Sequence, residues 1–316
     1  AVLQTKANAN INNFSGYIQN MTNFINGHLR LGLGVRLDNF SYKVDGYELG
    51  GLEDEEGNLG SRCNSSFPDP VDLNNPCALI LDGSESATKL QPKLSLAWSP
   101  TDRLPFSFYL NYGRGISSQD ARGVIRSPDA PKISTTDFYQ AGTSFNDQKV
   151  SFVFSTFLID RSHEQVYIPD DGSIEFAGRT RSYGIELRNS LRLTKWLSFN
   201  GGLTQVIRSY YPGEFTEDGR RVIVDSAPHT VANAALVFNE LKGFNFSFNW
   251  RHISNYRLDG EDTSIKAAGH DVIDFSLVKR LAKNIEVNFG IDNLFNKRYY
   301  ETQNYFESRT APGADV

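Results

Sequence analysis

Apolar and polar residues alternate at every second position, and this alternation constrains the fold of the chain more than any other feature. Phe244, Phe246, Phe248 and Trp250 alternate with asparagine, serine and arginine. Successive side chains of a β-strand point to opposite faces, so such a run predicts a strand with one apolar and one polar face. No stretch sustains the 3.6-residue period of an amphipathic helix. The sequence therefore predicts an all-β protein.

The alternation recurs about twelve times along the 316 residues. The predicted strands cover residues 10–23, 28–43, 87–99, 104–114, 135–146, 149–160, 179–193, 196–210, 227–239, 243–256, 269–280 and 284–294. Most exceed the ~5–6 residues usual in soluble sheets. They suit the ~9–11 residues with which a tilted strand crosses a bilayer, while no apolar run approaches the ~18 residues of a membrane helix.

The connections between these strands alternate in length. Tight turns are expected at Asn26-Gly27, Thr101-Asp102, Asn146-Asp147, Thr194-Lys195, Leu241-Lys242 and Ala282-Lys283, and long polar connections at about 44–86, 115–134, 161–178, 211–226 and 257–268. Outer-membrane barrels place short turns on the periplasmic side and long loops outside. A soluble sandwich has no reason to place its short turns at one end. The predicted fold is an antiparallel transmembrane β-barrel, with a secreted soluble β-sandwich binding module as an alternative.

Two tryptophans mark the short-turn end of the predicted sheet. Trp98 and Trp196 each fall beside a tight turn. In a barrel they belong to the aromatic girdle at the periplasmic membrane interface, whereas in a sandwich they would be core residues. The polar face carries Arg, Glu, Asp and Asn, and lines the lumen of a barrel.

The two cysteines lie in the first long connection. Cys63 and Cys77 are 14 positions apart in a segment rich in Pro, Asn, Asp and Ser, which predicts one disulfide and an oxidising compartment. Two buried free thiols are the alternative. The same connection holds the acidic run 53–56, which we interpret as a solvated loop rather than a calcium site because its spacing does not match an EF-hand.

No group of residues predicts catalysis. The five histidines, His28, His163, His229, His252 and His270, are scattered and lack metal-ligand spacing. No Gly-x-Ser-x-Gly nucleophile motif is present. With 32 Lys+Arg against 37 Asp+Glu, the net charge of −5 offers no basic face for nucleic acid. We expect no enzyme, no cofactor, no metal centre and no nucleic-acid partner.

The end of the chain resembles that of TonB-dependent outer-membrane receptors. In that family a late strand ends in an Asn-Leu-Phe-(Asn/Asp)-Lys-x-Tyr motif, and the matching positions here are Asn293, Leu294, Phe295, Asn296, Lys297 and Tyr299. Segment 226–233, Ser-Ala-Pro-His-Thr-Val-Ala-Asn, is similar to another late-strand entry of the family, and 34–38, Gly-Val-Arg-Leu-Asp, to its Gly-x-Arg-x-Asp strand. The three matches are spread over most of the chain.

The resemblance implies an uptake receptor in the bacterial outer membrane. Residues 1–316 would form a single partial β-barrel domain, about twelve strands of a larger 22-stranded barrel, with the plug domain and the last strand missing. The implied partners are outer-membrane lipid, TonB acting through an absent N-terminal segment, and a scarce ligand, with a ferric siderophore as the family default. A passive outer-membrane porin is the alternative within the barrel class.

Ligand contacts in such a receptor must face the lumen near the long-loop end. Alternation along the strands selects Arg208, Tyr210 and Arg251 at that end, and Arg36 at mid-height of its strand. Arginine grips anionic chelates in bidentate fashion, and tyrosine offers a stacking surface. The alternative is that these residues belong to interior salt-bridge networks.

Many charged residues share the predicted polar face, among them Arg30, Arg188 and Glu286. A narrow closed barrel packs its interior with side chains, so these charges favour a wide lumen. We therefore expect an open, curved sheet with unpaired edges near 10–23 and 284–294.

Overall fold

The structure is a computed structural model. It describes residues 5–49, 78–80, 82–101, 103, 105–126, 131–168, 173–224, 227–241, 243–259, 262–301 and 303. Cys63, Cys77 and the acidic run 53–56 lie outside the described residues, so the disulfide remains a prediction.

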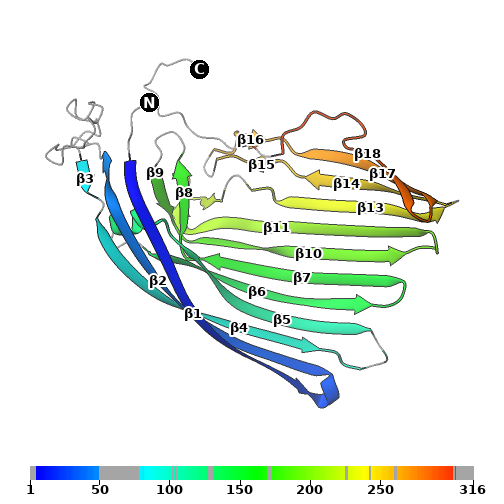
Figure 1. Cartoon of the computed structure of the whole chain (residues 1–316), viewed down its shortest axis with the longest axis horizontal. Helices are drawn as coiled ribbons and strands as arrows, with labels where there is room; N and C mark the ends of the chain where they lie inside the picture. Colours follow the sequence, from blue (N-terminus) through cyan, green and yellow to red (C-terminus); the bar gives the residue numbers. More distant parts are fainter. Residues whose placement is uncertain are drawn as a thin grey trace. The chain divides into compact units, whose positions relative to one another are not determined.

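Twelve strands follow one another through a single sheet in chain order (Figure 1). They are β1 (Thr5–Phe24), β2 (Leu29–Leu49), β4 (Gly83–Trp98), β5 (Phe106–Ser118), β6 (Ile133–Asn146), β7 (Val150–Arg161), β10 (Thr180–Arg192), β11 (Leu197–Phe215), β13 (Thr230–Leu241), β14 (Phe244–Ile253), β17 (His270–Ala282) and β18 (Ile285–Ile291). Each predicted strand coincides with one of them. The order begins at β1 and ends at β18, which confirms that these two strands are the sheet's edges.

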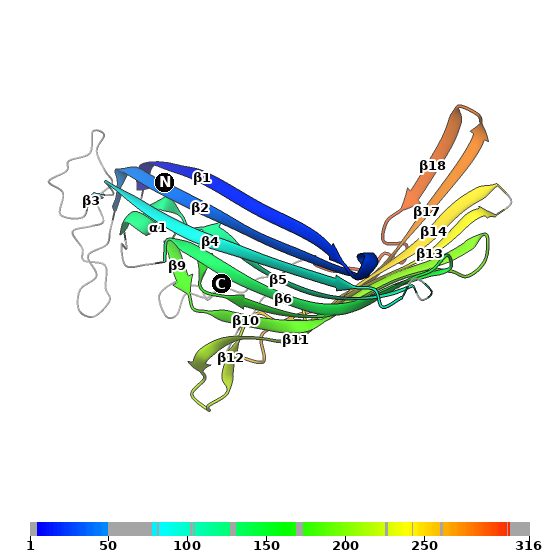
Figure 2. The same cartoon turned by 90° about the horizontal axis from the view of Figure 1, so that it is seen from below.

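The alternating connection lengths are confirmed, but the long connections carry structure that the sequence analysis did not predict. These additional elements are β3 (Ala78–Ile80), the helix α1 (Ala121–Arg126), the hairpin β8 (Glu164–Ile168) with β9 (Ser173–Ala177), β12 (Arg221–Ile223), and the hairpin β15 (Tyr256–Arg257) with β16 (Lys266–Ala267). β12 pairs with the end of β11, and the two project beyond the neighbouring strands (Figure 2). Among the described residues, no helix is long and apolar enough to cross a membrane.

The first tight turn shows why Asn-Gly is found there. Asn26 and Gly27 have φ angles of 54° and 90°, which asparagine and glycine tolerate better than other residues. They form the 3₁₀ turn η1 (Ile25–Gly27) between β1 and β2. Local turn chemistry therefore fixes the position of this hairpin.

Contacts within the chain define two compact units. The first comprises Ala1–Ile18, Val35–Gln91 and Ile116–Thr135, and the second comprises Gln19–Gly34, Pro92–Gly115 and Thr136–Val316. In the first unit, α1 packs Ala121 and Val124 against Tyr42 and Val44 of β2, and all four are nearly inaccessible to solvent. The Tyr42 hydroxyl also donates a hydrogen bond to the Lys132 carbonyl, 2.8 Å away. The connection between β5 and β6 is thus held against the side of β2 that carries its even-numbered residues.

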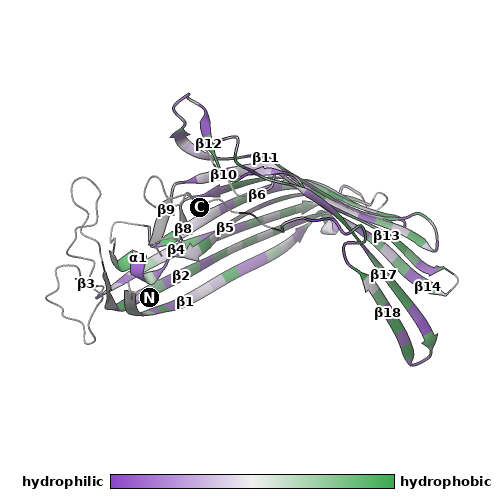
Figure 3. Ribbon diagram, turned by 90° about the horizontal axis from the view of Figure 1, so that it is seen from above, coloured by the Kyte–Doolittle hydropathy of each residue, from purple (hydrophilic) through white to green (hydrophobic). Residues whose placement is uncertain are grey.

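In the second unit the sheet has two faces of opposite character, as predicted. Phe238 of β13 pairs with Phe246 of β14, which pairs with Leu277 of β17. The rings of Phe238 and Phe246 stack with centroids 4.4 Å apart. On the opposite side, the hydroxyls of Ser247 and Ser276 lie 3.1 Å apart. We call these the apolar face and the polar face, and Figure 3 shows the alternation along β13, β14, β17 and β18.

The apolar face is bounded by aromatic residues at both ends. Trp98 and Trp196, beside short turns as predicted, lie against Phe108 and Phe238 with ring centroids 5.7 and 6.0 Å apart. Towards the long-connection ends, Tyr112 and Tyr139 lie with ring centroids 4.9 Å apart. Aromatic rings with one polar edge favour membrane–water interfaces, so the two rows mark the expected limits of the hydrocarbon layer.

Candidate functional site

A buried carboxylate organises the polar residues of the first unit. Asp38 of β2 is 1% exposed. It accepts hydrogen bonds from Arg36 Nε at 2.7 Å, from Asn13 Nδ2 at 2.9 Å and from the amide of Gln91. Arg36 Nη2 bonds Asp38 Oδ1 and Ser15 Oγ, each at 2.9 Å, and its side chain remains 43% exposed. Arg36 is therefore positioned by its neighbours while its guanidinium still reaches solvent.

A second charged network lies on the polar face of the second unit. Arg251 Nε is 3.2 Å from Asp274 Oδ2, and Arg251 Nη1 is 3.5 Å from Glu301 Oε1. The other oxygen of Asp274 accepts a hydrogen bond of 2.8 Å from the backbone N–H of Asn293. Asp274, which the sequence analysis did not single out, thus joins Arg251 to the turn that follows β18.

That turn contains the Asn-Leu-Phe motif. Asn293 has a φ of 52°. Its side-chain Oδ1 accepts a hydrogen bond from the backbone N–H of Lys297, and its Nδ2 donates one to the Lys297 carbonyl, each at 2.8 Å. Leu294 N bonds the Ile273 carbonyl at 2.7 Å, Asn296 N bonds the Asn293 carbonyl at 2.8 Å, and Phe295 is 72% exposed. The Tyr299 ring lies 4.5 Å from that of His270. The motif therefore closes the turn after β18 and holds it against β17.

A β-bulge reverses the expected orientation of Arg208 and Tyr210. Before the bulge in β11, Val206 pairs with Gly184 of β10. After the bulge, Arg208 pairs with Tyr183, and Tyr210 pairs with Arg181. Ile207 is the extra residue, and one extra residue shifts all later side chains to the other face. The prediction that Arg208 and Tyr210 lie on the polar face is therefore wrong.

The close approach of β10 and β11 at the bulge explains why position 184 is a glycine. A Cβ atom on Gly184 would lie 2.1 Å from the Gln205 carbonyl oxygen and 2.7 Å from the Phe157 ring. Only a residue without a side chain fits there, as is common where a bulge brings two backbones together. Beyond the bulge the hydroxyls of Ser182 and Ser209 lie 2.6 Å apart, so Ser209 takes the side opposite Arg208 and Tyr210.

Arg208 and Tyr210 line a cavity of about 410 Å³ at the end of β11. The remaining lining residues are Ser209, Thr216, Arg220, Arg221, Ile223, His229 and Arg257. The Arg221 guanidinium lies over the Tyr210 ring, 4.9 Å from its centroid, and 5.8 Å from that of Phe215. Arg220 pairs with Asp218 at 2.6 Å. Among the residues that the structure describes, four arginines and no carboxylate line the cavity.

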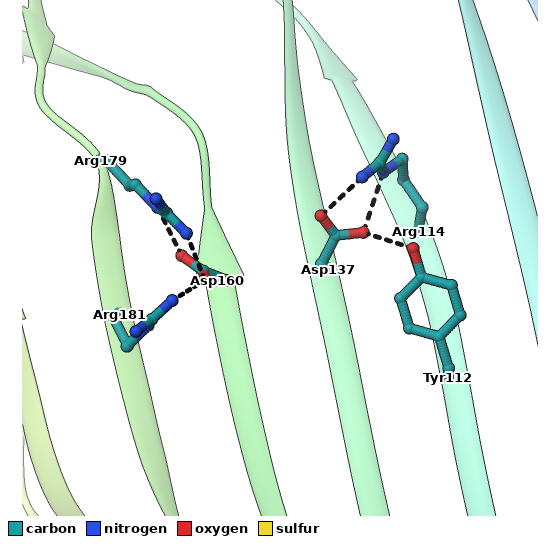
Figure 4. A network of polar contacts seen from close by, with 6 residues as sticks. All are labelled: Tyr112, Arg114, Asp137, Asp160, Arg179 and Arg181. Atoms are coloured by element: carbon teal, nitrogen blue, oxygen red, sulfur yellow. Dashed lines mark hydrogen bonds and ion pairs between the residues drawn. The ribbon is translucent and has the colours of Figure 1, made fainter.

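Charged residues also continue the apolar face beyond its last aromatic row (Figure 4). Arg114 of β5 binds Asp137 of β6 through two hydrogen bonds of 2.9 and 2.8 Å, and the Tyr112 hydroxyl donates to the same carboxylate. Asp160 of β7 pairs with Arg179 at 2.6 Å and with Arg181.

The register shows that these ion pairs lie on the apolar face. Leu158 lies on the apolar face, where it pairs with Tyr139 and Tyr183. Asp160 is two residues further along β7 and therefore lies on the same face, where it pairs with Asp137 and Arg181. The sequence analysis assigned charges to the polar face alone. The alternation Phe106, Phe108, Leu110, Tyr112, Arg114 was the signal that could have revealed them.

Within the described part of the chain, no three His, Cys, Asp or Glu side chains converge as a metal site. The candidate site thus consists of the Asp38 and Asp274 networks, the capped turn after β18 and the arginines at the end of β11. It can bind anions and position arginine side chains.

A family model described as TonB dependent receptor-like, beta-barrel, matches residues 3–294. The metal-pseudopaline receptor CntO of Pseudomonas aeruginosa strain UCBPP-PA14 is 23% identical over 180 residues, which cover 55% of this chain and 25% of that receptor. The chain therefore spans about a quarter of the length of that curated relative.

Solved structures share the fold. The ferric-catecholate import receptor Fiu from E. coli K12, in its closed form, superposes with a TM-score of 0.68 at 19% identity, over 93% of this chain and 42% of that chain. The copper transporter OprC gives a TM-score of 0.68 at 19% identity, over 93% and 43%.

Proteins of this family are transporters of the Gram-negative outer membrane, not enzymes. The predicted location in the outer membrane and the prediction that the chain is not an enzyme are therefore confirmed, and the soluble β-sandwich alternative is wrong. With its two-faced antiparallel sheet and a match over residues 3–294, the chain belongs to the TonB-dependent receptor β-barrel family.

Proposed function

We propose that the receptor containing this chain imports a metal chelate, most specifically a ferric siderophore, across the outer membrane. The observation that carries the proposal is the family match over residues 3–294. The names of similar proteins support a metal-bearing ligand, since they include a metal-pseudopaline receptor, a ferric-catecholate import receptor and a ferric yersiniabactin uptake receptor. Energy would reach the receptor through TonB.

We propose residues 1–316 as a single partial barrel domain of that receptor. The chain covers 42% of the Fiu chain and 43% of the OprC chain, which leaves room in a receptor of similar size for a plug domain, a TonB-binding segment and further strands. In this arrangement the polar face borders the lumen, and ligand release follows movement of the plug.

Arg36 and Arg251 are the proposed ligand contacts. Both lie on the polar side of their strands, and their side chains are 43% and 45% exposed. Their carboxylate partners orient each guanidinium, and a half-exposed arginine can still offer free N–H donors to an anionic chelate. Arg208 and Tyr210 are not included, because the bulge turns them to the apolar face.

Uptake of a radiolabelled ferric siderophore by whole cells tests this function. The receptor gene is deleted, and either wild type or Arg251→Gln is restored on a plasmid. We expect wild type to restore uptake, and Arg251→Gln to weaken half-saturation about tenfold, because one charge-assisted contact of roughly 1.5 kcal/mol or more is lost. Arg192→Gln, on the polar face at the short-turn end of β10, is the matched control and should leave uptake unchanged.

A TonB-deficient strain separates energised import from diffusion. Loss of uptake in that strain supports the proposal. Undiminished uptake without TonB would instead favour the passive porin, and absence of uptake for every ferric chelate in the wild-type strain would exclude the proposed ligand class.

A further inference from the structure

The chain that follows β18 turns back over the polar face at the long-connection end of the sheet. The backbone N–H of Asn293 donates to Asp274 at 2.8 Å, and the Tyr299 ring packs on the ring of His270, which is 4% exposed. Asp274 and His270 are even-numbered residues of β17 and lie on its polar side. We call residues 293–301 and 303 the return segment. Its contacts place it against the polar face.

The far end of the return segment is fixed as well. The Gln303 backbone N–H donates to the Tyr256 hydroxyl at 3.0 Å, and the Gln303 side-chain oxygen accepts from the Ala268 backbone N–H at 3.2 Å. Tyr256 is 8% exposed and packs in a small cluster with Ala267. The segment is therefore anchored near both ends, and Glu301 lies between the anchors.

Two carboxylates meet the guanidinium of Arg251 in different ways. Asp274 Oδ2 lies 3.2 Å from Nε, and the Asp274 side chain is 19% exposed. Glu301 Oε1 lies 3.5 Å from Nη1, and the Glu301 side chain is 61% exposed. Asp274 is also held by the backbone N–H of Asn293, whereas Glu301 accepts a hydrogen bond of 3.1 Å from the Tyr299 hydroxyl. Asp274 is thus fixed within the sheet, while Glu301 extends into solvent.

This geometry makes Glu301 the weaker of the two partners. An N–H···O hydrogen bond is usually about 2.7–3.2 Å long, so the contact of Arg251 with Glu301 is an ion pair rather than a well-formed hydrogen bond. Exposed ion pairs contribute little, because water screens the charges and two long side chains lose rotamer freedom. An incoming anion can therefore displace Glu301, whereas Asp274 remains in place and keeps the guanidinium oriented.

We propose that Glu301 is an internal competitor for the imported ligand on Arg251. The inference rests on the proposed function, in which Arg251 contacts an anionic chelate. Without ligand, the Glu301 carboxylate covers Nη1 and repels a second negative charge, and the bound chelate takes its place. Apparent affinity falls in proportion to the fraction of receptors that are competent to bind. Glu301 thus keeps the affinity of the site below the value that Arg251 and Asp274 alone would give.

Equilibrium binding of a radiolabelled ferric tricatecholate siderophore, a trianionic chelate, to the purified receptor tests the proposal. We expect Glu301→Gln to bind the chelate about threefold more tightly, because an exposed ion pair no longer has to open. Asp274→Asn should bind it about tenfold more weakly, since Arg251 loses its orienting partner. Glu286→Gln is the matched control, because Glu286 also pairs with an exposed arginine, Arg280, but at the short-turn end, and it should bind as wild type.

A double variant shows whether Glu301 acts through Arg251. In the Arg251→Gln background, Glu301→Gln should have no further effect, because the group for which it competes is gone. Heat-modifiable migration on a gel establishes that each variant is folded. Unchanged or weaker binding by folded Glu301→Gln would refute the competitor role alone, as would an equal gain in the Arg251→Gln background. If Arg251→Gln itself leaves binding unchanged, the ligand contact of the proposed function fails and the competitor role falls with it.

A measurement without ligand tests the same contact whatever the receptor imports. Phenylglyoxal modifies free guanidinium groups, and mass spectrometry gives the rate of modification at Arg251 in the whole receptor. We expect Glu301→Gln to raise this rate about threefold, because the guanidinium is no longer covered, and Glu286→Gln to leave it unchanged. Equal rates at Arg251 in wild type and Glu301→Gln would overturn the proposal.

Discussion

Replacing Phe248 by arginine is expected to lower the free energy of unfolding of the receptor in lipid vesicles by about 2–4 kcal/mol, the cost of arginine at the bilayer midplane. Phe248 lies near the centre of β14, between Leu236 and Phe275 of the neighbouring strands. Its ring is 5.1 Å from that of Phe275 and is 38% exposed on the apolar face. Arginine there would place a charge in hydrocarbon.

Two neighbouring substitutions control this measurement. Asn249→Arg places the same charge one residue away on the polar face, where a water-filled lumen would accommodate it. Phe244→Arg lies beside the short turn, near the interface, and should cost only about 0–1 kcal/mol. Equal losses for Phe248→Arg and Asn249→Arg, measured by urea unfolding, would contradict the assignment of the two faces.

Replacing Asp38 by alanine should destabilise the receptor by about 3 kcal/mol, the low end for breaking a buried charge pair. The carboxylate is 1% exposed and accepts hydrogen bonds from Arg36, Asn13 and Gln91. Its removal leaves four N–H donors of these three side chains without their acceptor. Arg36 remains partly solvated, which keeps the cost from rising further.

Asp45→Ala is the matched control for Asp38. It removes a carboxylate from the same strand at an exposed position and should change the free energy of unfolding by less than about 0.5 kcal/mol. Comparable losses for Asp38→Ala and Asp45→Ala in urea unfolding would show that the buried network contributes no particular stability.

The strands were predictable because the signal is local. Alternation of side chains and tight-turn residues such as Asn26-Gly27 follow directly from backbone geometry, so each of the twelve sheet strands matches a predicted range. The Asn-Leu-Phe motif was identified through its resemblance to the family, and the structure shows that its Asn293 adopts a positive φ and caps the turn after β18 with its own side chain.

The errors have a different physical origin. Assigning alternate residues of a strand to opposite faces assumes regular strand pairing without a bulge. The extra residue Ile207, beside the close approach of Gly184 to the Gln205 carbonyl oxygen, turns every later side chain of β11 to the other face. Arg36 is two residues from Asp38, but the other partners of Asp38 come from β1 and β4, up to 53 positions away, and no local pattern connects them. The short hairpins of the long connections, such as β15–β16, depend on a small cluster around Tyr256 and Ala267 rather than on alternation.

The most direct test of a two-faced, lipid-embedded sheet is a spin-label scan of β11 from Phe199 to Tyr210, in the receptor with Cys63 and Cys77 replaced by serine. Collision with lipid-soluble oxygen should exceed collision with a water-soluble nickel complex at odd positions up to Leu203. Beyond Val206 the pattern should reverse, so that Arg208 and Tyr210 report the lipid-facing side and Ser209 does not. Uninterrupted alternation through Tyr210 would contradict the bulge, and equal accessibility at odd and even positions would contradict the membrane-spanning sheet itself.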